Sequence, residues 1–206
     1  MPKLRLLLIR HAEVEASFQR KFGGRIDMNL SPEGRVQAET LAAFLQRKPL
    51  AAIYASPMKR VQQTLAPMLV NGTPQPVILD GLREVDFGDW SGYSWEGVHE
   101  KFRVHAGDWL NHLENGTIPN GESGAAFRAR VEPCLREIIS RHGGQTVAVA
   151  CHGGVIRMLL SILLELPLPR TNAFDIEYAS VTEVALRPRG AEIQLLNFTP
   201  WRDLPQ

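Results

Sequence analysis

KLRLLLIRH, residues 3–11, and TVAVACHGG, residues 146–154, are the two stretches that decide how this chain folds. Each begins with a short apolar run without helical spacing, which is typical of a strand buried on both faces. Each run leads to a histidine, His11 in the first and His152 in the second. If the two strands are parallel neighbours, both histidines leave the sheet at the edge where open α/β sheets bind ligands. Two unrelated polar residues at strand ends are the alternative interpretation.

Strands and helices are predicted to alternate along the rest of the chain. Further short apolar runs predict strands at residues 51–55, 77–79, 181–186 and 192–198, the last two as a hairpin. Serines that can cap a helix predict helix starts at Ser31, Ser56 and Ser123, the first two followed by proline. An apolar helix is predicted to follow Gly153-Gly154.

This alternation predicts a single α/β domain spanning residues 1–206. We expect three α/β/α layers, with a mostly parallel central sheet and helices on both faces. The segment from about residue 81 to residue 120 is predicted to form a lobe of loops and helices over the carboxyl-terminal edge of the strands.

Composition excludes several classes of protein and of partner. The 206 residues are 44% hydrophobic and 22% charged, which excludes a disordered, coiled-coil or collagen-like chain. The net charge of +1 gives little attraction to nucleic acid or to membrane surfaces. The longest apolar stretch, residues 158–164, is far shorter than the ~20 residues of a membrane span. Two cysteines cannot build a disulfide scaffold, and nothing directs export, so we expect a cytoplasmic protein.

Five short motifs follow one another in the sequence. They lie at residues 6–15 (LLLIRHAEVE), 24–38, 54–64, 82–92 (LREVDFGDWSG) and 149–157. In this order they resemble the motifs of the histidine phosphatase superfamily, also called phosphoglycerate mutase-like. Ala12 replaces the glycine of the family's first motif, which is acceptable where the backbone has negative φ.

The resemblance implies a role for each matched residue. Arg10 and Arg60, together with His152, would bind the phosphoryl group, as suits guanidinium groups that stay protonated and match phosphate geometry. His11 would attack phosphorus through one ring nitrogen, and Glu84 would protonate the leaving oxygen and later deprotonate water. The further phosphate contacts that the resemblance implies are Ser17, Gly23, Gly24 and Gly153. It implies no metal and no cofactor.

Among the hydrolases, the chain resembles the broad-specificity and α-ribazole phosphate phosphatase branch, with a small phosphate ester as substrate. Phosphoglycerate mutase-type transfer and a catalytically inactive binding member are alternatives. Arg20, Lys21 and Arg25 either contact a second anionic group or are solvated loop charges. The oligomeric state is open, a homodimer included.

A second phosphate-loop pattern overlaps the fifth motif. Residues 151–157 satisfy C-x-x-G-x-x-R, in which Cys151 would be the nucleophile, but this interpretation leaves the other four motifs unexplained. We therefore expect Cys151 to be a packed, small apolar residue. Trp90, Tyr93, Trp95 and Trp109 would pack the lobe or form a wall around the organic part of the substrate. The remaining histidines show no metal-binding spacing and are expected to face solvent: His99, His105, His112 and His142.

Overall fold

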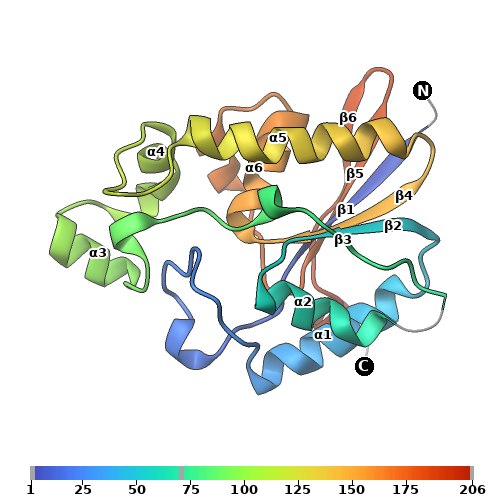
Figure 1. The fold of residues 1–206 in the computed structure, drawn as a ribbon, viewed down its shortest axis with the longest axis horizontal. Coiled ribbons are helices and arrows are strands. Elements are labelled where there is room, and N and C mark those ends of the chain that lie inside the picture. Colours follow the sequence, from blue (N-terminus) through green and yellow to red (C-terminus); the bar gives the residue numbers. More distant parts are fainter. Residues whose placement is uncertain (1–2, 70–71, 205–206) are drawn as a thin grey trace.

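The computed structural model describes residues 3–69 and 72–204 (Figure 1). Within them, six strands form one sheet in the order β3-β2-β4-β1-β5-β6. The strands are β1 (Leu4–Arg10), β2 (Leu50–Ala55), β3 (Val77–Ile78), β4 (Thr146–Cys151), β5 (Val181–Arg187) and β6 (Gly190–Phe198). Strands β1 to β4 are parallel, whereas β5 runs antiparallel to β1 and β6 antiparallel to β5. The predicted α/β class with a mostly parallel sheet is confirmed.

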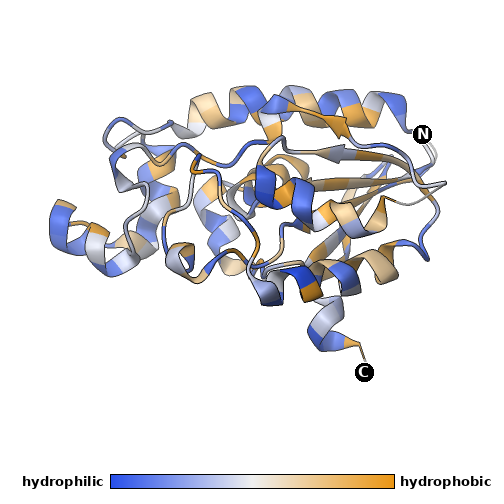
Figure 2. Cartoon of the chain, turned by 60° about the horizontal axis from the view of Figure 1, so that its bottom comes forward, coloured by the Kyte–Doolittle hydropathy of each residue, from blue (hydrophilic) through white to orange (hydrophobic). Residues whose placement is uncertain are grey.

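Helices cover both faces of the sheet, because β1 and β4 alternate their side chains between two apolar clusters. Leu6 and Leu8 pack with α5 (Gly124–Arg141) and α6 (Gly153–Leu163). Leu7 and Ile9 pack with α1 (Pro32–Leu45) and α2 (Lys59–Leu65) on the other face. Figure 1 shows these two helix pairs above and below the strands, and Figure 2 shows apolar strands inside and polar helix surfaces outside. Each such fully buried Leu contributes about 1.5–3 kcal/mol.

Two of the three predicted serine caps are present. Ser31 accepts a hydrogen bond from the Gly34 backbone N–H at 2.9 Å, and Ser123 accepts one from Ala126 at 3.2 Å. The prediction for Ser56 is wrong, since α2 begins at Lys59 after Met58, which makes no side-chain cap. Lys59 N–H instead donates to Asp27 Oδ1 from a distant loop, which supplies a tertiary substitute for the local cap.

The lobe contains α3 (Trp95–Phe102) and α4 (Trp109–Glu114), joined by short turns, at the left of Figure 1. Trp90 is buried at its centre, where its ring lies 5.2 Å from that of His112. His112 is therefore half-buried, contrary to prediction. His142 is also half-buried, and its Nε2 lies 2.9 Å from the Tyr54 hydroxyl.

A short last helix, α7 (Pro200–Asp203), packs against α1. None of the helices in the described part of the chain combines the length and apolar character that crossing a bilayer requires.

Candidate active site

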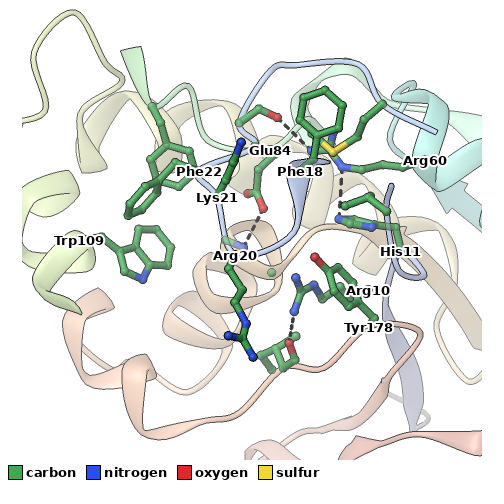
Figure 3. Close-up of a pocket in the computed structure, with 18 of the residues that line it drawn as sticks. Arg10, His11, Phe18, Arg20, Lys21, Phe22, Arg60, Glu84, Trp109 and Tyr178 are labelled. Carbon is green, nitrogen blue, oxygen red and sulfur yellow. Dashed lines mark hydrogen bonds between the residues drawn. The ribbon is translucent and has the colours of Figure 1, made fainter. Parts of the chain in front are cut away.

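A cleft of about 260 Å³ opens where β1 and β4 end. Figure 3 shows Arg10, His11, Arg60, Glu84 and Tyr178 around one cavity, with Phe22 and Trp109 farther along it. The walls come from the end of β1, the loop before α1, helix α2, the lobe, the start of α6 and the segment before β5.

The parallel pairing of β1 and β4 brings the two strand-end histidines together. Arg10 lies opposite Cys151 in the register, and the His11 backbone N–H donates to the Cys151 carbonyl at 3.1 Å. The imidazole rings of His11 and His152 are consequently 5.2 Å apart between centroids. Both side chains are buried, His152 completely.

Hydrogen bonds select the tautomer of His11. Its Nδ1 lies 2.8 Å from the Ala12 carbonyl oxygen, which can only accept, so Nδ1 carries the proton and Nε2 a lone pair. Hydrogen bonds on both sides of Ala12 hold this carbonyl in place, because the Ala12 N–H donates to Thr64 Oγ1 at 2.9 Å and the Glu13 N–H, in the same peptide group as the carbonyl, donates to Gln37 Oε1 at 3.0 Å. Ala12 itself lies outside the left-handed backbone region, so its Cβ is tolerated and packs in the core.

One guanidinium connects the two histidines. Arg60 Nε lies 3.2 Å from His11 Nε2 and also 3.2 Å from His152 Nδ1, so one N–H is shared between two acceptors. His152 is thereby assigned the Nε2–H tautomer, and its Nε2 lies 2.8 Å from Ser56 Oγ, which accepts that proton. The other Arg60 nitrogens donate to the carbonyls of Ile26 at 2.8 Å and Gly24 at 2.9 Å.

Burial and positive charge keep both histidines neutral. Burial first, and then the charges of Arg60 and Arg10, hold the pKa of His11 well below its ordinary value. The pKa of His152 is held well below its ordinary value by burial and then chiefly by Arg60. Burial lowers the pKa of Arg60 to about 10, so Arg60 still carries its charge near pH 7. The cleft thus holds an unprotonated imidazole nitrogen beside a permanent cation, which suits nucleophilic attack on an anion.

Arg10 is held in place by contacts with the segment that precedes β5. Its guanidinium carbon lies 4.0 Å from the centre of the Tyr178 ring, and one terminal nitrogen donates to the Ile176 carbonyl. Its Nε is buried without a hydrogen-bond partner among the described residues. A buried donor of this kind is costly unless something accepts from it, so Arg10 is able to bind an anion.

Glu84 reaches the cleft from a loop and meets the start of α6. Its Oε1 accepts from the Val85 N–H at 3.0 Å, and its Oε2 accepts from the Gly154 N–H at 3.2 Å. A Cβ at position 154 would lie 2.5 Å from Oε1. Glycine at position 154 is what lets the carboxyl group approach the helix so closely.

Some of the other residues singled out in the sequence line the cleft, and others do not. Gly23, Gly24, Gly153, Arg20 and Lys21 line the cleft, but Arg25 does not. The prediction for Ser17 is not supported, because Ser17 is exposed on the turn Ala16–Phe18 and Phe18 lines the cleft instead. Of the four lobe aromatics, Trp95 and Trp109 line the cleft.

Cys151 is ill suited to be a nucleophile. It is fully buried at the end of β4, does not line the cleft, and burial raises the pKa of its thiol. Arg157, the arginine of the overlapping pattern, donates to the carbonyls of Thr171 and Phe174.

Sequence reasoning missed two residues at the site, Ser56 and Tyr178. Ser56 was interpreted as a helix cap. A buried imidazole needs a hydrogen-bond partner for each ring nitrogen, and the sequence analysis assigned no such partner to His152, which was the available signal. Tyr178 precedes the predicted hairpin and has no distinguishing pattern in the sequence. No three His, Cys, Asp or Glu side chains in the described ranges are placed to hold a metal ion together.

A mostly parallel sheet, with arginines and neutral histidines where its parallel strands end, is suited to binding and transferring a phosphoryl group. The chain belongs to the histidine phosphatase superfamily (branch 1), whose family model matches residues 6–199. It is 33% identical to phosphoserine phosphatase 1 of Hydrogenobacter thermophilus over 196 residues, covering 95% of this chain and 93% of the relative. It is 29% identical to the adenosylcobalamin/alpha-ribazole phosphatase of Salmonella typhimurium, covering 94% and 96%.

The solved structures agree with this assignment. The alpha-ribazole phosphatase from Shigella flexneri superposes with a TM-score of 0.82 at 25% identity, covering 95% of this chain and 96% of that one. The predicted family and the predicted phosphoric monoester hydrolase are both confirmed.

Proposed function

We propose that His11 is the nucleophile of a two-step hydrolysis of phosphate monoesters. In the first step, His11 Nε2 forms a bond to phosphorus while the ester P–O bond breaks. Arg10 and Arg60 supply the positive charge and the N–H groups that stabilise the equatorial oxygens of the phosphoryl group. The neutral His152, whose Nδ1 accepts from Arg60, would join them at the phosphoryl group. The Arg60 N–H that both histidines share in this structure would turn to a phosphoryl oxygen.

Glu84 would handle the proton in both steps. Its carboxyl group gives a proton to the leaving oxygen, so the product is a neutral alcohol. It then takes a proton from the water that attacks phosphorus, the P–N bond to His11 breaks, and inorganic phosphate leaves. The carboxyl position beside Gly154, at the start of α6, supports this assignment.

The observation that carries the proposal is the His11 tautomer. A proton fixed on Nδ1 by the Ala12 carbonyl leaves Nε2 as the free base, inside a cationic cleft. Rapid mixing with substrate followed by quenching should yield a phosphorylated protein whose phosphate is stable in alkali and lost in acid.

His11→Ala should form no such adduct and should lose turnover, whereas His99→Ala, at an exposed histidine of the lobe, is the matched control. An acid-stable adduct, or normal turnover of His11→Ala, would disprove the proposal. Transfer of the phosphoryl group to a phosphorylated acceptor in place of water would favour the mutase alternative. A folded protein that binds phosphate esters without turnover would favour the inactive binding member.

The charge of the cleft supports a substrate class. Five cationic residues line it, Arg10, Arg20, Lys21, Arg60 and Arg157, and Glu84 is the one acidic residue among the described lining residues. Aromatic side chains make up the far wall, among them Phe22, Trp95 and Trp109. We therefore infer that the organic part of the substrate is apolar or anionic, not cationic.

A panel of matched esters tests this inference. Naphthyl phosphate and phosphoglycerate should give higher kcat/KM than phosphocholine, whose quaternary ammonium would meet like charge. Phosphoserine, which carries both charges, should lie between them. The opposite order, with phosphocholine best, would show that the lining cations do not select the substrate.

We also propose that the protein works in the cytoplasm, which two free thiols, Cys134 and Cys151, support.

A further inference from the structure

Arg130 lies on α5, and all three nitrogens of its guanidinium group donate hydrogen bonds, either to one short loop or to one carboxylate. Its nitrogens donate to the carbonyls of Gly81 at 2.8 Å, Arg83 at 2.7 Å and Glu84 at 2.9 Å. They also donate to both oxygens of Glu122, at 2.6 Å and 2.8 Å. Its guanidinium carbon lies 4.6 Å from the centre of the Phe127 ring.

Glu122 holds the same loop from its other end. Its Oε2 accepts from the Asp86 N–H at 3.3 Å, and its own N–H donates to the Asp86 carbonyl at 2.8 Å. The side chains of this ion pair are only 20% and 10% exposed, so solvent screens them less than a surface pair. The loop also lies directly on α5, because a Cβ at Gly81 would be 2.4 Å from the Arg130 carbonyl oxygen.

The loop held in this way carries Glu84. Residues 83–87 belong to no helix or strand, so no ladder of backbone hydrogen bonds positions the carboxyl group. Arg130 supplies the missing constraint by binding the carbonyl of Glu84 itself and those of two residues before it. On the cleft side, the carboxyl group accepts a hydrogen bond from the Gly154 N–H at 3.2 Å. Arg130 does not line the cleft, so it can act on substrate only through Glu84.

We propose that the Arg130–Glu122 ion pair is a positioning device that sets how well Glu84 delivers its proton to the leaving oxygen. The proposal rests on the proposed function, in which Glu84 is the proton donor. A bidentate fork and three carbonyl bonds need a planar guanidinium, so lysine cannot reproduce them. Displacement of a catalytic group by about 1 Å can cost about 10²-fold in rate.

The experiment compares two substrates that differ in leaving group. An alkyl phosphate needs a proton on its leaving oxygen, whereas p-nitrophenyl phosphate needs much less assistance. The value of kcat/KM reports the phosphorylation step for both. Glu84→Gln is the reference, and its loss should be about 10²-fold for the alkyl ester and much smaller for the nitrophenyl ester.

Arg130→Lys should show the same selectivity, with a loss of about tenfold or more for the alkyl ester and at most a few-fold for p-nitrophenyl phosphate. Glu122→Gln should show it at a smaller size, because the carbonyl bonds of Arg130 remain. The matched control is Arg128→Lys on the same helix, at an exposed arginine paired with Glu132 at 3.1 Å. Arg128→Lys should change neither substrate. Thermal midpoints verify that each variant is folded.

A double variant separates positioning from a general loss of structure. If Arg130 acts through Glu84, Arg130→Lys should cost little in the Glu84→Gln background. Equal losses for both substrates, or losses that multiply in the double variant, would overturn the positioning role. If Glu84→Gln itself shows no selectivity, the proton-donor role of Glu84 fails, and that result is distinct from failure of the Arg130 inference.

Discussion

Cys151 and His152 are neighbours in the chain and both are fully buried, but Cys151 packs in the apolar core whereas His152 contacts Arg60, which lines the cleft. We expect Cys151→Ser to keep most of its kcat, with a stability loss of about 1–3 kcal/mol if the buried hydroxyl finds no partner. His152→Ala removes a group that faces the shared Arg60 N–H, and kcat should fall by about 10²–10³-fold. Steady-state kinetics of both variants, after a folding check by circular dichroism, gives the order. A dead Cys151→Ser beside an active His152→Ala would restore the cysteine mechanism.

The two buried histidines should make the protein less stable as the pH falls. Their pKa values in the native state lie well below the ordinary value, so below about pH 6.5 the unfolded chain binds more protons. The free energy of unfolding should then decrease with falling pH, by up to about 1.4 kcal/mol per pH unit for each histidine. Urea unfolding at pH 7.5, 6.5 and 5.5 measures this slope. His11→Gln should flatten it, and equal stability at pH 7.5 and 5.5 would contradict the assignment.

At this scale, the sequence predicted best the residues that end a strand. Arg10, His11 and His152 follow apolar runs whose register is set by the core, so their place at one edge could be deduced. The position of Ser17 could not be deduced in this way, because a turn decides which of two adjacent side chains faces the cleft, and here it is Phe18. The Ser56–His152 contact joins residues 96 positions apart, and no local pattern reports it.

Among the elements, the start of α6 is the one whose local conformation most directly shapes the cleft. Gly154→Ala should favour the helix by about 1 kcal/mol, yet its Cβ would lie 2.5 Å from Glu84 Oε1 and 3.0 Å from Val85 Cγ2. The flexible carboxyl group would move aside at little cost in stability but out of position. We expect kcat/KM for an alkyl phosphate to fall by about tenfold or more.

Gly153→Ala is the comparison for that variant, since its Cβ would make ordinary contact with Arg10 Nε at 3.7 Å. It should lose less activity than Gly154→Ala. Equal losses, measured with the same alkyl ester, would show that crowding of Glu84 is not the cause.

Helices were predicted well where the cap is local and poorly where it is not. Ser31 and Ser123 each bond a backbone N–H three residues ahead, so their sequence alone is informative. The start of α2 depends on Asp27, which lies 32 positions before Lys59, and Ser56 is needed elsewhere. Of the two serines that are followed by proline, Ser31 therefore begins a helix directly, whereas Ser56 lies before α2 without capping it.

For the whole molecule, we expect activity without an added metal ion. Arg10 and Arg60 line the cleft, and in the proposed mechanism they supply the positive charge that a divalent cation supplies in other phosphoryl-transfer enzymes. Turnover should survive extensive treatment with EDTA. Loss of turnover in EDTA that Mg²⁺ or Zn²⁺ restores would contradict this, and undiminished activity in metal-free buffer would support it.

The sequence predicted every strand of the described sheet in its place along the chain, because an apolar run is a local property of the sequence. The lobe was predicted only as a region, since its aromatic contacts join residues of mixed polarity without a period. We propose that residues 1–206 form one domain, as both apolar clusters draw on elements from the first and last thirds of the chain.

The central place of β1 in the sheet bears on how the protein is made. Its partners are β4, through pairs such as Arg5 with Thr146, and β5, through pairs such as Leu6 with Val184. A ribosome adds about 5–20 residues per second, so β1, which is synthesised before β4 and β5, waits several seconds, at least, for both neighbours. During that time its leucines and both of its hydrogen-bonding edges are unpaired, which is the kind of segment that chaperones bind. His11 therefore acquires its contacts with Cys151 and His152 late in translation, when β4 and β5 have left the exit tunnel.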